Sequence, residues 1–192
     1  MARASSFANW HDHPNGVHPT ASMRDWLTDR ASLTYKLIAN SAQFRVQRLH
    51  QHRALCLADE CAAILLPQRQ LVQERDVLLC CDGHPVVLGH TVLSLTATTA
   101  EWPFFGTLGE RSLGTTLFGD PLVVRGQLQY ARLYDGHPLV RRMCAATGAA
   151  SLSTPLFARR STFRRKGGVM LVTEVFFPEI KFLRTVLKDV SS

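Results

Sequence analysis

Two pairs of alternating segments, each joined by a tight-turn sequence, constrain the fold of this chain most strongly. In the first pair, residues 72–81 run into an Asp-Gly turn and return over residues 86–95. In the second pair, residues 159–165 run into a Lys-Gly-Gly turn and return over residues 169–177. Apolar residues at every second position are typical of strands, and Asp-Gly or Gly-Gly between them favours a hairpin. We therefore expect an antiparallel sheet built around two hairpins.

The segments around these hairpins predict helices and further strands. Helical spacing and capping residues predict short helices at residues 22–27, 32–38, 54–66, 140–146 and just before residue 118. Period-two patterns predict strands at residues 43–49 and 122–134. This mixture indicates the α+β class, with an antiparallel sheet of about six strands and helices packed on it. Residues 1–20 show no periodicity and predict a flexible tail, so we expect residues 21–192 to form a single domain.

The composition fits a globular protein. A chain of 192 residues with 46% hydrophobic content is long enough to build one sizeable core. No run approaches the roughly 20 apolar residues that cross a bilayer, and no secretory signal is recognisable at the start of the chain. We therefore expect a cytoplasmic protein without membrane insertion. The formal charge of +7 favours anionic partners, a category that includes nucleic acid, lipid headgroups and small carboxylates.

Cysteine and histidine residues do not form a recognisable metal-site pattern. The five cysteines match neither zinc-ligand spacing nor a disulfide framework, so we interpret them as buried residues or free thiols. His11 and His13 form one close pair and His50 and His52 another, but no cysteine or acidic residue stands at ligand spacing from either pair. We expect solvated histidines and no metal.

One cation and one anion occupy strand positions where core residues are expected. Glu174 shares a face with Val172 and Phe176, and Arg75 shares a face with Val77 and other apolar residues of its strand. An inward guanidinium and an inward carboxylate on different strands indicate a small polar pocket inside the sheet domain. Alternatively, the two side chains form a buried ion pair that fixes the sheet.

Several segments, taken in order, resemble the motifs of the chorismate lyase family. They are Trp26-Leu27 with Ser32-Leu33-Thr34, Glu74-Arg75-Asp76-Val77-Leu78-Leu79-Cys80, Ser112-Leu113-Gly114-Thr115-Thr116-Leu117-Phe118, Ala158-Arg159-Arg160-Ser161 and Leu171-Val172-Thr173-Glu174-Val175-Phe176-Phe177-Pro178. Each segment alone is a weak signal. Their order, together with the inward positions of Arg75 and Glu174, makes the resemblance specific, and it spans nearly the whole chain after residue 20.

The resemblance implies a lyase that eliminates pyruvate from chorismate and forms 4-hydroxybenzoate at the head of ubiquinone biosynthesis. It also implies that Arg75 binds the ring carboxylate together with the backbone amides of Leu33 and Leu113, and that Glu174 faces the ring hydroxyl. A planar guanidinium offers a carboxylate a two-pronged hydrogen bond that lysine cannot supply. Aromatisation drives the reaction, so no metal or organic cofactor is expected. Glu174 either orients the hydroxyl or exchanges a proton, and we favour orientation.

Chorismate carries a second carboxylate, on its enolpyruvyl arm, for which a second cation is expected. The candidates are His90, Arg159 and Arg160, of which His90 stands where the family often has arginine. The closed pocket of family members further implies slow product release and product inhibition.

Two other functions compete with this interpretation. The effector domains of GntR-type regulators resemble chorismate lyase in fold, so the chain could be a non-catalytic sensor of small aromatic acids, although no winged-helix domain is recognisable before the sheet. Nucleic-acid binding would rest on the net charge and the basic segment 159–166, but no stacking aromatics are interleaved there. We expect a monomer that binds no nucleic acid.

Overall fold

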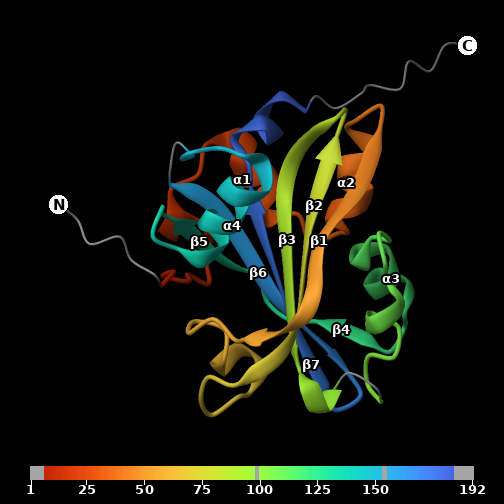
Figure 1. The fold of residues 1–192 in the computed structure, drawn as a ribbon. Helices are drawn as coiled ribbons and strands as arrows, with labels where there is room; N and C mark the ends of the chain where they lie inside the picture. Colours follow the sequence, from red (N-terminus) through yellow and green to blue (C-terminus); the bar gives the residue numbers. More distant parts are fainter. Residues whose placement is uncertain (1–6, 98–99, 153–154, 184–192) are drawn as a thin grey trace, which may run out of the picture.

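The computed structural model describes residues 7–97, 100–152 and 155–183, which build one antiparallel sheet with helices on both faces (Figure 1). Its strands are β1 (Phe44–Leu55), β2 (Leu71–Cys81), β3 (His84–Ser94), β4 (Val123–Arg125), β5 (Gln129–Leu133), β6 (Leu156–Arg165) and β7 (Gly168–Phe176). Its helices are α1 (Ala21–Thr28), α2 (Leu33–Ala39), α3 (Leu113–Gly119) and α4 (Pro138–Thr147). The predicted α+β class is confirmed, with seven strands where about six were expected.

The strands follow the order β1-β2-β3-β7-β6-β4, and β5 also pairs with β6. This order places the two predicted hairpins side by side, because β3 of the first pairs with β7 of the second. At the β2–β3 turn, Asp82 has a φ of 52° and Gly83 a φ of 84°. Positive φ at both central residues is what a type I′ hairpin turn requires. The β6–β7 turn lies at Lys166 and Gly167, since Arg165 pairs with Gly168, so both hairpins turn at the predicted residues.

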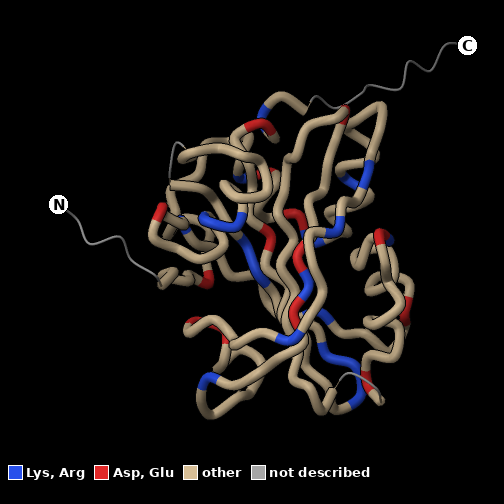
Figure 2. The backbone as a smooth tube through the Cα atoms, in the orientation of Figure 1, with Lys and Arg blue, Asp and Glu red and all other residues tan. Residues whose placement is uncertain are grey.

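Period two along the strands gives the sheet two different faces. On one face, Val77 and Leu79 join the helices α1 and α2 in a shared core. On the other face, Leu78 and Leu88 pack with α4 through residues such as Met143. Figure 1 accordingly shows α2 and α3 on one side of the central strands and α4 on the other. Charged residues of both signs also occur along the central strands and not only in the loops (Figure 2).

Two predicted elements differ from the structure. The helix expected at residues 54–66 is wrong: β1 continues to Leu55 because its last residues pair with the start of β2, and only Ala62–Ile64 form a short 3-10 turn. The long strand expected at residues 122–134 is divided into β4 and β5. Between them the backbone of Gly126 donates a hydrogen bond to the Thr162 carbonyl at 2.8 Å, and a Cβ there would lie 2.5 Å from Thr162 Oγ1.

Part of the stretch predicted as a flexible tail packs against the sheet. His11 and Tyr130 exchange two backbone hydrogen bonds of 2.8 Å, and Val17 is buried beside α1 and α2. Residues 1–6 lie outside the described residues. Among the residues that are described, no helix has the length and apolarity needed to span a membrane.

Candidate functional site

A cavity lies between one face of the sheet and the first residues of α2 and α3. Every strand of the order β1-β2-β3-β7-β6-β4 contributes to its wall. The residues that matter for its chemistry are Leu33, Thr34, Arg75, Gly89, Ser112, Leu113, Gly114, Phe118, Arg125, Ser161, Phe163 and Glu174. The structure therefore brings all four residues singled out from the sequence, Leu33, Arg75, Leu113 and Glu174, to one cavity.

Arg75 is a buried cation without an acidic partner among the described residues. Its side chain is 1% exposed, and its Nη2 donates to the carbonyls of Gly109 and Arg111 at 3.0 Å each. Its Nε is buried and has no hydrogen-bond partner in the described part of the chain. Burial, followed by the charge of Arg48, lowers the pKa of Arg75 to about 10. An unpaired guanidinium in this position favours an anionic ligand, because a bound carboxylate would offset the cost of burying the charge.

The first turns of α2 and α3 lie next to each other at the cavity. The residues that precede them, Ser32 and Ser112, do not cap them with a side-chain hydrogen bond. Thr34 and Ser112 share a hydroxyl hydrogen bond, which joins the two helix starts. A Cβ on Gly114 would lie 2.8 Å from Thr34 Oγ1, so this approach requires glycine. The backbone N–H groups at these starts, including those of Leu33 and Leu113, are donors available to a ligand.

Glu174 lies on the far side of β3 from Arg75. Glu174 pairs with Gly89 of β3, whereas Arg75 pairs with Thr91. Two strand spacings across the sheet and two residues along it correspond to a Cα separation of about 12 Å. Because β3 contributes only glycine opposite Glu174, the space between the two side chains stays open. The separation suits an aromatic ring held at opposite ends by two side chains.

The ionic partner of Glu174 is Arg159, not Arg75. Arg159 Nε donates to Glu174 Oε2, and its Nη1 donates to the carbonyls of Trp26 and Asp29 at 2.9 and 2.7 Å. Arg159 is fully buried, and its hydrogen bonds link the Glu174 carboxylate to the end of α1. The alternative of a buried Arg75–Glu174 ion pair is therefore wrong. Glu174 keeps its other carboxylate oxygen for a ligand, since its side chain is still 16% exposed.

Arg125 is a cavity cation that the sequence interpretation missed. It ends β4 and donates from Nε to Ser161 Oγ at 2.9 Å and from Nη1 to the Arg30 carbonyl at 2.9 Å. Its guanidinium lies 5.5 Å from the ring centres of both Phe118 and Phe163. Burial lowers the pKa of Arg125, and the nearby charge of Glu174 partly offsets this. One signal was available in the sequence: a lone arginine after two valines and before a glycine.

Two of the expected candidates for a second carboxylate lie elsewhere. His90 is completely buried; its Nδ1 contacts Asp76 and its Nε2 lies 2.8 Å from Glu60 Oε1. Burial opposes its charged form, but these two carboxylates outweigh it and hold the pKa of His90 well above its usual value. Arg160 is buried over the ring of Trp10. Neither residue lines the cavity. Because Arg159 and Arg160 are both buried, the basic segment 159–166 does not present them as an exposed surface.

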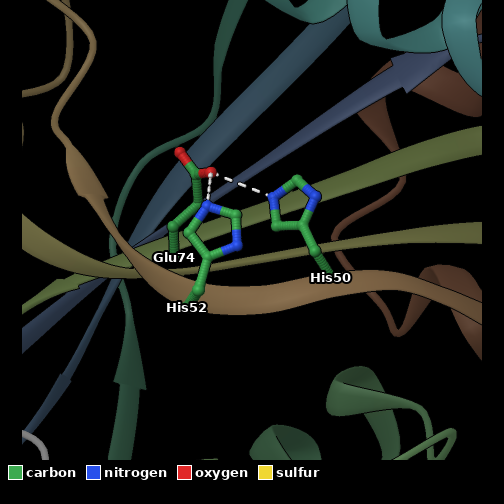
Figure 3. A group of neighbouring side chains, drawn as sticks. All are labelled: His50, His52 and Glu74. Carbon is green, nitrogen blue, oxygen red and sulfur yellow. Dashed lines mark hydrogen bonds and ion pairs between the residues drawn. The ribbon is translucent and has the colours of Figure 1, made fainter.

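His50 and His52 have an acidic partner that their sequence spacing does not reveal. The pairing of β1 with β2 places Glu74 opposite His52, and Figure 3 shows both imidazoles directed at the Glu74 carboxylate. Their Nε2 atoms lie 3.0 and 3.7 Å from Glu74 Oε1. One atom of each group lies within 4.8 Å of the others, which is close enough for a shared cation. However, Arg142 already contacts both Glu74 oxygens at 3.0 and 3.1 Å, so we interpret the group as an ion-pair network.

The cysteines are free thiols, as interpreted from the sequence. Four are buried and Cys144 is half-buried. The Cys56 and Cys61 sulfur atoms lie 3.3 Å apart, and burial raises the pKa of Cys56 above its usual range. A thiol with a raised pKa is a poor nucleophile, which fits a packing role.

Comparison with known proteins shows which family this chain resembles. The family model described as chorismate lyase matches residues 4–186. A probable chorismate pyruvate-lyase of Cupriavidus metallidurans is 45% identical over 174 residues, which are 90% of this chain and 81% of the relative. A relative with the same description in Dechloromonas aromatica is 40% identical and covers 92% of this chain and 98% of its own.

Solved structures with the same fold are found at low sequence identity. The C-terminal domain of PhnF has a TM-score of 0.55 at 14% identity, covering 79% of this chain and 94% of that domain. The effector domain of PhnF from Mycobacterium smegmatis has a TM-score of 0.50 at 16% identity and covers 78% of this chain and 90% of that chain. Identities this low show the fold alone. The family match and the relatives go further, and on them the chain belongs to the chorismate lyase family.

Proposed function

We propose that this protein is a chorismate pyruvate-lyase, which eliminates pyruvate from chorismate and releases 4-hydroxybenzoate for ubiquinone biosynthesis. The names of its relatives support this reaction. The observation that carries the proposal is a buried arginine without an acidic partner among the described residues, in the same cavity as a carboxylate that has its own cation. Such a cavity suits a ligand with an anionic end and a hydroxyl end.

In the proposed complex, Arg75 binds the ring carboxylate. Its unpartnered Nε points to one charge-assisted hydrogen bond, and the backbone N–H groups of Leu33 and Leu113 supply further donors. Backbone donors cost little side-chain entropy when they order around a ligand. The hydrogen bonds of Arg75 to Gly109 and Arg111 hold the guanidinium in place before the ligand arrives.

Glu174 accepts the hydrogen bond of the ring hydroxyl in this proposal. Arg159 Nε donates to one of its two carboxylate oxygens and holds the group in place. A carboxylate whose position is fixed by a buried guanidinium is suited to orienting the ring. This arrangement supports the orienting role rather than proton exchange.

The proposed reaction needs only positioning and electrostatic support. The bond between a ring carbon and the enolpyruvyl oxygen breaks, and its electron pair leaves with the oxygen. The neighbouring carbon, which bears the hydroxyl, loses its hydrogen as a proton, and the electrons of that bond complete the aromatic ring. The enolpyruvate takes up one proton on its methylene carbon and becomes pyruvate. Aromatisation drives the elimination, so the mechanism calls for no metal or organic cofactor.

Incubation of the purified protein with chorismate tests this function. We expect pyruvate and 4-hydroxybenzoate in equal amounts, detected by a coupled pyruvate assay and by chromatography against authentic hydroxybenzoates. Chromatography also identifies the regioisomer. A protein that binds 4-hydroxybenzoate but releases no pyruvate would be a sensor instead of a lyase.

Substitution of Glu174 separates its two possible roles. Glu174→Gln retains a hydrogen-bonding side chain but removes the carboxylate, so near-normal turnover would end the proton-exchange alternative. If this variant binds 4-hydroxybenzoate as the wild type does and yet fails to turn over, the orienting role is wrong. The measurements are the dissociation constant of 4-hydroxybenzoate and kcat for chorismate.

We also expect the protein to act as a monomer in the cytoplasm, without nucleic acid.

A further inference from the structure

The second carboxylate of chorismate belongs near Glu174, provided that the function proposed above holds. The enolpyruvyl ether is attached to the ring carbon next to the one that bears the hydroxyl. If the ring carboxylate lies at Arg75 and the hydroxyl at Glu174, the enolpyruvyl carboxylate must lie at the Glu174 end. A second cation is therefore required at that end of the cavity, because a carboxylate buried without a partner is strongly destabilised.

Arg125 occupies that position. It lines the cavity together with Glu174, and its hydrogen-bond partner Ser161 pairs with Val172, the residue two positions before Glu174 on β7. The hydrogen bonds to Ser161 and Arg30 engage Nε and Nη1 of Arg125, whereas its Nη2 has no hydrogen-bond partner among the described residues. The flanking rings of Phe118 and Phe163 fix the plane of the guanidinium. The Arg125 guanidinium is therefore held in a fixed orientation, and its Nη2 is available as a donor to a ligand.

The other cations near the sheet do not meet the requirement. Arg75 serves the ring carboxylate at the opposite end. Arg159 uses Nε for Glu174 and Nη1 for carbonyl groups. Its Nη2 has no hydrogen-bond partner among the described residues, but Arg159 is fully buried and does not line the cavity. His90 and Arg160 lie outside the cavity.

We propose that Arg125 binds the enolpyruvyl carboxylate of chorismate and stabilises the leaving enolpyruvate. As the carbon–oxygen bond breaks, negative charge grows on the enolpyruvyl oxygen while the carboxylate keeps its own charge. A fixed guanidinium beside both groups favours the transition state over the bound substrate. The product 4-hydroxybenzoate lacks this second carboxylate, so Arg125 contributes to substrate binding and turnover but not to product binding.

This difference between substrate and product gives the test. Arg125→Gln should lower kcat/KM for chorismate roughly 10- to 100-fold, as expected for the loss of one charge-assisted contact. The dissociation constant of 4-hydroxybenzoate, measured by calorimetry on the same preparation, should stay within about threefold. Arg125→Lys keeps the charge without the planar fork and should fall between the wild type and Arg125→Gln.

Arg132 supplies a matched control. It is also a strand arginine that donates to backbone carbonyls, those of Val17 and His18, and lies over a phenylalanine ring. It does not line the cavity, so Arg132→Gln should leave kcat/KM for chorismate unchanged. The inference is overturned if Arg125→Gln retains kcat/KM within threefold, or if it weakens 4-hydroxybenzoate binding as much as chorismate turnover. A wild-type protein that releases no pyruvate would overturn the proposed function and this inference together.

Discussion

At the scale of single residues, the site depends on how buried charges are paired. Glu174 has a counter-ion in Arg159, whereas Arg75 has only two carbonyl groups and the open cavity. Burying a guanidinium without an anion costs stability, and the cost is recovered when a carboxylate binds. The unpaired cation is therefore the residue whose substitution says most about ligand binding.

Arg75→Lys should separate charge from geometry. Lysine keeps the positive charge but lacks the planar guanidinium, which presents N–H donors to the carbonyl groups and to a carboxylate in fixed directions, so we expect 4-hydroxybenzoate to bind roughly 10- to 100-fold more weakly. In thermal unfolding, a 4-hydroxybenzoate concentration 100 times the wild-type dissociation constant should add about 2.7 kcal/mol to wild-type stability and much less to the variant. An equal shift in both proteins would show that Arg75 does not contact the ligand.

The same scale shows what the sequence can and cannot predict about the site. Strand period two was sufficient to place Arg75 and Glu174 each among the apolar residues of its own strand, because that property is local. Arg125 reaches the cavity only through the pairing of β4 with the end of β6, where Arg125 lies opposite Phe163. Likewise, Glu74 reaches His52 only through the register of β1 and β2. Long-range register cannot be read from local patterns, so these contacts could not be predicted.

At the scale of elements, turn residues predicted the hairpins well, whereas apolar spacing predicted the helices less well. The β2–β3 hairpin follows from its two turn residues, whose backbone conformation is special. Residues 54–66 have apolar residues at helical spacing, yet pairing with β2 outweighs this preference up to Leu55, and Leu65 adopts a left-handed conformation that ends the short turn. Tertiary pairing outweighs a weak local preference for helix.

A polar cluster joins three elements on the sheet face opposite the cavity. Asp76 of β2, His90 of β3 and Glu60 in the turn after β1 form one buried chain of contacts. Burial raises the pKa of Asp76, but His90 and Arg142 outweigh it and lower that pKa below its usual range. Because the folded-state pKa of His90 is raised above the unfolded value of 6.5, its stabilising effect is complete below that pH and is lost as pH rises through the folded-state pKa.

His90→Gln should therefore destabilise the protein in a pH-dependent manner. Near pH 6 the loss of the buried imidazolium should lower the free energy of unfolding by about 3–5 kcal/mol, because two carboxylates lose their partner. The difference from wild type should shrink as pH rises above the neutral range. Urea denaturation of both proteins between about pH 6 and pH 10 measures this. A difference that is constant across this range would mean that His90 is neutral in the folded protein.

At the scale of the whole molecule, the N-terminal segment contributes to the fold. Backbone bonds join His11 to Tyr130 of β5, and Arg132 of the same strand donates to the Val17 carbonyl at 2.7 Å. The side chain of Val17 is 1% exposed and packs with residues of α1 and α2. These contacts connect the start of the chain to the core that lies beside the cavity.

Removal of residues 1–19 should lower the free energy of unfolding by about 2–4 kcal/mol, the sum expected for one buried valine and a few hydrogen bonds. Val17→Ala isolates the side-chain part and should cost roughly 1–2 kcal/mol. Chemical denaturation of the three proteins gives both values. If the shortened chain is as stable as the full one, the contacts of this segment contribute nothing to folding.

The position of β3 between the two charged groups has a consequence for substrate range. Arg75 and Glu174 stand on strands that do not touch, and the distance between them follows from main-chain pairing through Thr91 and Gly89. Swapping one side chain for another changes the group and its reach at either end but leaves the main-chain spacing unchanged. A change in that spacing would require slippage of an entire strand, and a slip by one residue would also reverse which of its residues face the interior. The backbone spacing between the two ends of the site is therefore harder to alter than the chemical groups that stand there.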